Sequence, residues 1–304
     1  MSLALAAGGA RGAYHVGALL FFAETGVRFD AVAGTSIGAL NAAFYAAGDR
    51  SPRHIGELLR FWRRLPDANP IVISPTGVRD KLSMLFAATR LDWPSVVSSI
   101  LTWSPILDPE PLARLLDDAL DFEAICRSQV RVYIAIVEEL HPLLDILIGH
   151  TYEAEYLEAS SMSAEVLRRV LLAAAAIPAL FPSVDIGGRK FADAALADAL
   201  PGRILMRTGE KRIVSIFLSN ATIQDRADYP DAALFQLRPT FAIDGGIRAT
   251  LDFSRDAIER LIEMGYNDAR QQYNETTSVL RPLIDRNAVR ARAESLAHDL
   301  PRRD

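Results

Sequence analysis

Residues 34–38 constrain the fold most, because they read Gly-Thr-Ser-Ile-Gly between a short apolar run and a helical pattern. Residues 29–33 have the length and apolar character of a buried strand, and apolar residues then recur at helical spacing as far as Gly48. The segment therefore predicts a strand, a sharp turn and a helix, with Ser36 in the turn. Helix N-terminal N–H groups surround a hydroxyl placed there, which makes Ser36 a candidate nucleophile toward an acyl group. A serine between glycines also occurs in ordinary turns, and that interpretation stays open on the motif alone.

A second strand, loop and helix opens the chain. Residues 3–7 form an apolar run, a helix is predicted over residues 13–25, and between them lies a glycine-rich loop made of Gly8, Gly9, Ala10, Arg11 and Gly12. Such a loop directs several backbone N–H groups into one concavity, which suits a phosphate or an oxyanion. Two units of this kind in succession predict an α/β sheet with both loops at the carboxyl ends of neighbouring strands.

Nucleotide binding at the glycine-rich loop is a competing interpretation, and the spacing fits it poorly. Ala7 stands where the dinucleotide fingerprint requires its first glycine. Asp30 is about the right distance downstream, but it lies at the start of the next predicted strand rather than at its end.

Three patches of the chain together resemble the patatin-like phospholipase family. They are residues 7–12 with His15-Val16-Gly17, residues 34–38, and residues 172–182 followed by Phe191-Ala192-Asp193-Ala194-Ala195 and Pro201. The resemblance implies a three-layer α/β/α sandwich with a mostly parallel central sheet. It also implies that the loop of Gly8, Gly9, Ala10, Arg11 and Gly12 is the oxyanion hole, and that Ser36 is a nucleophile paired with Asp193 in a dyad without histidine.

The second block departs from the family pattern at one position. Ala194 replaces the glycine that follows the family's aspartate, so a positive φ there would carry a steric cost. Asp193 as a turn carboxylate or helix N-cap is the alternative interpretation. Asp198 is a weaker candidate base that we expect to face solvent, and we expect His15 to pack in the interior.

Other catalytic classes fit less well. An α/β-hydrolase shares the serine turn, but it needs more strands before that turn and a histidine after it, and His298 lies in a polar tail. The five histidines and the single Cys126 show no zinc-site spacing, so we expect no metal and no cofactor. The net charge of −5 gives no overall attraction to nucleic acid.

Composition and segment pattern predict one domain over residues 1–304, with a motif-bearing core at about 1–220, a helical insertion at about 51–120 and C-terminal helices at about 247–304. Prolines divide the insertion into predicted short helices and loops, and we expect its three tryptophans to be core residues rather than lipid contacts. Elsewhere the pattern predicts helices at 108–120, 164–176, 252–274 and in the tail 281–304, a loop-rich stretch at 219–246, and strands at 130–137, 143–148, 184–186, 189–193 and, as the last interior strand, 212–218.

The predicted function is therefore that of a lipid acyl hydrolase. Its substrate would be a phospholipid or another acyl ester. A single cysteine, the absence of a signal-like N-terminus and the lack of a long apolar run favour a cytoplasmic protein, with peripheral contact to a membrane surface as an open alternative. A catalytically weakened protein that binds lipid or a partner is the second hypothesis. Head-group preference, dependence on an activator and oligomeric state stay open.

Overall fold

The computed structural model describes residues 1–68, 70, 72–74, 105–139, 153–219, 224–243 and 246–298. In chain order its elements are β1 (Ser2–Leu5), η1 (Gly9–Gly12), α1 (Ala13–Glu24), β2 (Ala31–Thr35), α2 (Ile37–Ala46), α3 (Pro52–Ala68), β3 (Val72–Ile73), β4 (Leu107–Asp108), α6 (Glu110–Ala119), α7 (Phe122–Cys126), β5 (Arg131–Glu138), β6 (Ala154–Glu158), η2 (Ala159–Ser161), α9 (Ala164–Ala175), β7 (Val184–Ile186), β8 (Arg189–Asp193), η3 (Ala194–Leu196), α10 (Gly202–Arg207), β9 (Arg212–Ile216), η4 (Arg226–Asp228), β10 (Ala233–Leu237), α11 (Gly246–Thr250) and α12 (Arg255–His298). The predicted strand at 143–148 and two of the tryptophans, Trp93 and Trp103, lie outside the described residues.

The central sheet is mixed and mostly parallel, with the strand order β10-β9-β1-β2-β5-β8-β7 and β6 paired to β5. The strands from β10 to β5 are parallel to one another, whereas β6, β7 and β8 make antiparallel pairs. Every residue of β1 and β2 is buried, as expected for strands covered on both faces. The predicted three-layer α/β/α architecture is confirmed.

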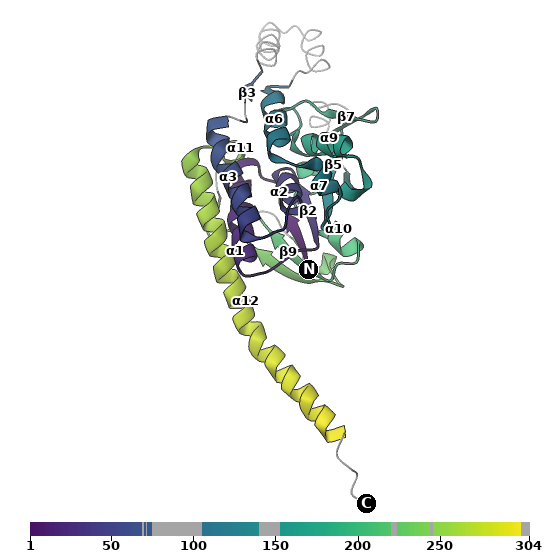
Figure 1. The fold of residues 1–304 in the computed structure, drawn as a ribbon, viewed down its shortest axis with the longest axis vertical. Helices are drawn as coiled ribbons and strands as arrows, with labels where there is room; N and C mark the ends of the chain where they lie inside the picture. Colours follow the sequence, from purple (N-terminus) through teal and green to yellow (C-terminus); the bar gives the residue numbers. More distant parts are fainter. Residues whose placement is uncertain are drawn as a thin grey trace, which may run out of the picture.

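Helices cover the sheet where its strands are most buried. α2 packs on β1, β2 and β5, α10 packs on β1, β2 and β9, and α9 packs on β5, β7 and β8 (Figure 1). α1 lies between α3 and α12, and the second half of α12 extends beyond the rest of the molecule (Figure 1). None of the helices in the described part of the chain combines the length and apolar character needed to cross a bilayer.

α1 and α12 cross in direct backbone contact. A Cβ atom on Gly17 would lie 1.9 Å from the carbonyl oxygen of Ile262, and one on Gly265 would lie 2.0 Å from that of Tyr14. Only glycine permits such an approach, because any side chain would overlap the facing backbone. Beside this crossing, Asp268 accepts hydrogen bonds from the Tyr14 hydroxyl at 3.0 Å and from the Thr240 backbone at 2.9 Å.

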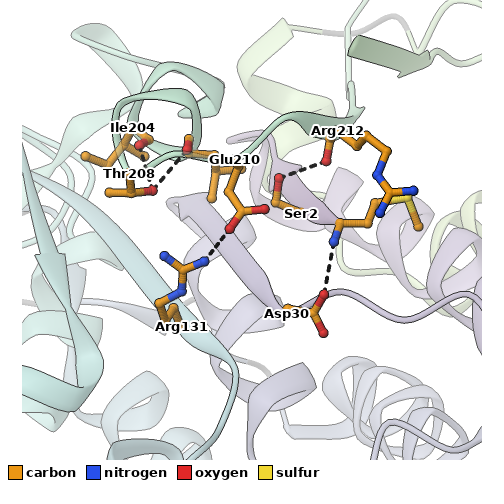
Figure 2. A network of polar contacts seen from close by, with 9 residues as sticks. Ser2, Asp30, Arg131, Ile204, Thr208, Glu210 and Arg212 are labelled. Atoms are coloured by element: carbon orange, nitrogen blue, oxygen red, sulfur yellow. Dashed lines mark hydrogen bonds and ion pairs between the residues drawn. The ribbon is translucent and has the colours of Figure 1, made fainter. Parts of the chain in front are cut away.

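Polar contacts join the amino-terminal ends of the central strands (Figure 2). The Met1 amino group contacts Asp30 Oδ2 at 3.0 Å, and the Ser2 hydroxyl donates to the Arg212 carbonyl at 3.1 Å. Arg131 at the start of β5 forms an ion pair with Glu210 just before β9. Asp30 therefore lies at the end of the sheet where these strands begin. β1 and β2 finish at the opposite end of the sheet, and the glycine-rich loop follows β1 there.

The observed elements differ from the predicted ones at three places. Residues 219–246 contain the strand β10, which pairs outside β9. Residues 154–158 form β6, a strand for which no prediction was made. In the tail, α12 is one continuous helix from Arg255 to His298 instead of two.

The proline-rich segment also holds a longer helix than predicted. α3 runs for 17 residues through Pro66. Pro66 lies in the last turn, where it removes one backbone hydrogen bond. The buried face of Ile55, Leu58, Trp62 and Leu65 compensates by packing on the core. Trp62 is fully buried, so the expectation that it is a core residue is confirmed.

Candidate active site

Ser36 occupies the turn between β2 and α2 with φ 57° and ψ −129°, a backbone conformation that costs free energy in a residue other than glycine. The two glycines of the motif permit it: a Cβ on Gly34 would lie 2.3 Å from the Gly38 carbonyl oxygen, and one on Gly38 would lie 2.3 Å from that of Leu5. Ser36 is 5% exposed and stands at the N-terminus of α2. The predicted strand, sharp turn and helix are all present.

Asp193 ends β8 at the register of Ile136 on β5. Its Oδ1 accepts a hydrogen bond of 2.9 Å from the Ala195 backbone, and its backbone N–H donates to the Ala176 carbonyl at 2.9 Å. Its Oδ2 is buried without a hydrogen bond of standard geometry. Asp193 is thus the N-cap of η3, which was the alternative interpretation of this residue. The N-cap hydrogen bond fixes Oδ1 and leaves Oδ2 for another partner.

Burial raises the pKa of Asp193 to about 7, while interactions with the Ser36 side chain and the Ala195 backbone lower it in part. Ser36 and Asp193 therefore lie near enough for the hydroxyl to affect the carboxyl group. Burial and the Ser36 contact together make Asp193 a candidate acid–base group at neutral pH.

The glycine-rich loop forms η1 beside Ser36. The Arg11 backbone N–H donates to the Gly8 carbonyl at 3.2 Å, whereas among the described residues the amides of Gly8, Gly9 and Ala10 have no hydrogen-bond partner. Gly9 lines the same cavity as Ser36. Of the predicted oxyanion-hole residues, Gly8, Gly9 and Ala10 therefore have backbone amides without a partner in the described part of the chain, and Gly9 is the one of them that lines the cavity.

The Arg11 side chain is held in place by two uncharged groups of the protein. Its Nε donates to the Gly8 carbonyl at 3.2 Å and its guanidinium donates to Thr250 Oγ1 at 3.1 Å. These bonds tie the glycine-rich loop to α11, where a Cβ on Gly9 would lie 2.2 Å from the Thr250 carbonyl oxygen. Thr250 was not among the predicted site residues, because nothing in the sequence around it indicates a contact with a loop at the other end of the chain.

An apolar cavity of about 70 Å³ opens beside Ser36 and Gly9. We call it the Ser36 cavity. Its other walls come from α2, α3, α6, the end of α9 and the segment around α11, and they are formed by Ile37, Leu40, Phe61, Leu65, Pro70, Leu112, Leu115, Leu116, Ala175, Ile177, Phe181, Thr250, Leu251 and Phe253. A space with these walls suits hydrocarbon and disfavours a charged group.

Asn41 on α2 connects the helix that follows Ser36 to the end of the glycine-rich loop. Its Nδ2 donates to the Gly12 carbonyl at 3.1 Å and lies 3.3 Å from His15 Nδ1, while its Oδ1 accepts a hydrogen bond of 3.0 Å from Trp62 Nε1. Burial lowers the pKa of His15 to about 3, so its ring is neutral, and it packs in the interior as expected. A polar Asn41 on an otherwise apolar helix face was the signal that could have revealed this network.

Two further expectations about the second block need revision. Ala194 has no positive φ, so the anticipated steric cost does not arise. Asp198 is half-buried rather than solvent-facing: its Oδ2 accepts a hydrogen bond of 2.5 Å from the Tyr156 hydroxyl, and its Oδ1 accepts one of 3.2 Å from the Leu200 backbone. Its carbonyl accepts a hydrogen bond from Thr35 at 2.8 Å, which ties this loop to the end of β2.

Comparison with known proteins places the chain with this site in a known family. The family model described as patatin-like phospholipase matches residues 3–206, which is more than half of the chain. The chain belongs to the patatin-like phospholipase family. The resemblance inferred from the three sequence patches is confirmed.

Relatives of this family member differ from it in size. It is 36% identical over 85 residues to the lysophospholipase NTE1 of Mycosarcoma maydis, an alignment that covers 25% of this chain and 4% of the relative. Human GIVD cytosolic phospholipase A2, solved with methyl γ-linolenyl fluorophosphonate, has a TM-score of 0.50 at 13% identity, over 92% of this chain and 59% of the other. VipD from Legionella pneumophila has a TM-score of 0.42 at 14% identity, over 90% of this chain and 66% of the other. The chain thus spans only part of each relative, and the human structure supports the fold alone.

Proposed function

We propose that this family member is a serine lipid acyl hydrolase that cleaves the carboxylic esters of phospholipids or lysophospholipids at a membrane surface. The observation that carries the proposal is the buried Asp193 carboxyl beside the strained Ser36, at the end of an apolar cavity. Membership of a phospholipase family supports the substrate class.

The proposed reaction needs two side chains. Asp193 Oδ2 accepts the hydroxyl proton as Ser36 Oγ attacks the ester carbonyl, and the protonated carboxyl then gives this proton to the departing alcohol oxygen. In the second half, Asp193 takes a proton from water, the hydroxide attacks the acyl-serine, and Ser36 is released with its proton restored. The products are one alcohol and one carboxylic acid.

A carboxylate is a weak base toward a hydroxyl, so most of the rate acceleration must come from stabilising the oxyanion. The free amides of Gly9 and Ala10 and the N-terminus of α2 are the proposed donors. Loss of one such donor typically costs about 10²–10³ in rate.

The test is ester hydrolysis by the purified protein, with phosphatidylcholine, lysophosphatidylcholine and p-nitrophenyl butyrate as substrates. We expect Ser36→Ala and Asp193→Asn each to lower kcat by at least ~10³, since the two groups act as a unit. Ser215→Ala is the matched control, because Ser215 is a fully buried serine on β9 outside the Ser36 cavity. A fluorophosphonate that carries an acyl-like chain should label Ser36 in the wild type.

Equal rates in the wild type and in both dyad variants would exclude this enzyme function. The remaining hypothesis would then be a protein that binds lipid or a partner without turnover. Ala194 gives that hypothesis no steric support, because its backbone does not adopt the conformation that requires glycine.

A further inference from the structure

A second hollow adjoins the Ser36 cavity. It has a volume of about 320 Å³ and lies between α6 and α9, and we call it the α6–α9 groove. Three side chains line both spaces, Leu112 on α6, Ala175 at the end of α9 and Phe181 in the turn after α9. The two spaces are therefore neighbours that share these three residues as a wall.

The remaining groove walls are mostly apolar. They include Ala113, Leu172, Pro182 and Val184, with the polar residues Glu110, Arg168 and Ser183 also present. Arg168 donates to Asp117 at 2.5 and 2.7 Å, so its charge is already matched by an ion pair that joins α9 to α6. The groove thus offers an apolar surface and no unmatched cation to an anionic head group.

The Ser36 cavity alone is too small for a fatty acyl chain. Its volume of about 70 Å³ is less than half of the roughly 150 Å³ of an engineered apolar cavity that binds benzene, a ligand of six carbons. A long chain with its carbonyl carbon at Ser36 must therefore continue into another space, and the groove is the apolar space directly behind the cavity wall.

The three wall residues do not all belong to the same part of the core, since Leu112 packs against the main cluster. Phe181 belongs to a small separate cluster with Leu107 and Ala176. It lies two residues after Ala179, whose φ of 64° is unfavourable for alanine. Phe181 is therefore the wall residue whose side chain would have to move for the two spaces to join.

We propose that the acyl chain of the substrate runs from Ser36 past Leu112 and Phe181 into the α6–α9 groove, and that Phe181 and the groove determine chain-length preference. The inference rests on the proposed esterase function for its kinetic test. Each methylene removed from water favours binding by up to about fourfold, so filling the groove favours long chains over short ones.

The experiment compares kcat/KM for p-nitrophenyl decanoate and p-nitrophenyl butyrate, both kept below their micellar concentrations. Leu172 is half-buried and lines only the groove, so Leu172→Trp fills the groove without entering the Ser36 cavity. We expect the decanoate-to-butyrate ratio to fall about tenfold. Val166→Trp is the matched control on the same helix, because Val166 is 37% exposed and lines neither space, and the ratio should stay at the wild-type value.

Phe181→Leu is the opposite variant, since a smaller side chain opens the wall and should raise the ratio severalfold. Circular dichroism and thermal unfolding establish that each variant is folded. An unchanged ratio in both Leu172→Trp and Phe181→Leu would overturn the inference, and it would leave the hydrolase proposal intact as long as butyrate is cleaved.

A binding measurement separates the two proposals if no ester is cleaved. Decanoic acid is titrated calorimetrically into the Ser36→Ala protein, with and without Leu172→Trp. Tenfold weaker binding in the double variant supports the groove even though the hydrolase proposal has failed. Equal affinity in the two proteins overturns the groove assignment.

Discussion

Asp193 is a carboxyl group that folding removes from water. Burial raises its pKa to about 7, and the contact with Ser36 and the Ala195 N–H only partly offsets that shift. At neutral pH the group is therefore divided between its acid and base forms. This is the condition under which one residue can accept a proton in one step and return it in the next.

The activity should follow the ionisation of Asp193. Only the carboxylate can accept the Ser36 proton, so we expect kcat/KM for p-nitrophenyl butyrate to rise with pH and to level off above an apparent pKa of about 7. The measurement is a pH–rate profile from pH 5 to 9 with the protein's fold checked at each pH. A profile that is flat between pH 5 and 8 would contradict the assignment of Asp193 as the base.

The same group should make the protein less stable as the pH rises. The unfolded pKa of an aspartate is about 3.9, so between about pH 4 and 7 the folded state binds a proton that the unfolded state has lost. The stabilisation is complete below pH 4 and is lost as the pH rises through the folded pKa, by up to about 4 kcal/mol.

Urea denaturation of the wild type and of Asp193→Asn at pH 4, 5.5 and 7.5 measures this effect. The free energy of unfolding of the wild type should decline relative to the variant across the window, because asparagine cannot ionise. A constant difference at all three pH values would show that Asp193 has a normal pKa.

At the scale of elements, the Asn41 side chain joins the glycine-rich loop to α3 through Trp62. Removing it leaves the Gly12 carbonyl, the Trp62 N–H and His15 without this partner inside the core. We expect Asn41→Ala to lower the free energy of unfolding by at least about 2 kcal/mol, and to lower kcat as well because the Gly12 carbonyl is no longer held.

Trp62→Phe is the control for this prediction. It removes one donor but keeps an aromatic ring, and Asn41 can still hold Gly12. It should therefore cost stability while keeping kcat near the wild-type value. Should kcat fall equally in the two folded variants, Asn41 would have a stabilising role without a positioning one.

The crossing of α1 and α12 gives a second prediction at this scale. A methyl group on Gly265 would overlap the Tyr14 carbonyl, so Gly265→Ala should destabilise the protein by at least about 2 kcal/mol in denaturant unfolding. Gly56→Ala is the control: its Cβ would have its nearest neighbour 3.9 Å away, so this helical position should gain up to about 1 kcal/mol. Equal effects of the two changes would mean that the helices do not touch at Gly265.

At the scale of the molecule, the elements predicted best from the sequence are those that neighbouring residues determine. Both early strand, loop and helix units are present, and the β7–β8 hairpin has the predicted bounds, because turn glycines and alternation specify such elements. β10 was missed because its pairing with β9 is a long-range edge contact that no neighbouring residue signals. The pattern likewise predicted Ser36 and Asp193 as candidates, but not the cavity walls at Thr250, Leu251 and Phe253, which reach the site only through tertiary folding.

During refolding, ester hydrolysis should recover only after the whole sheet has assembled. Ser36 and Asp193 belong to strands that are distant in the chain, and their proximity depends on β8 pairing with the end of β5. After dilution from urea, ester hydrolysis should therefore return with the slowest folding phase, later than most of the helical circular dichroism signal. Activity that reappears together with the earliest helical signal would contradict this dependence.

The strand β5 continues to Glu138, past Ala135, which is the register partner of the last β2 residue, Thr35. The β7–β8 hairpin docks on that overhang, so the proposed acid reaches the serine from outside the parallel strands. During synthesis, Ser36 would leave the ribosome long before Asp193, because 156 residues lie between them in the chain. If the proposed chemistry holds, an incomplete polypeptide that lacks Asp193 would not hydrolyse the lipids around it. Hydrolysis would begin only once the β7–β8 hairpin has paired with β5.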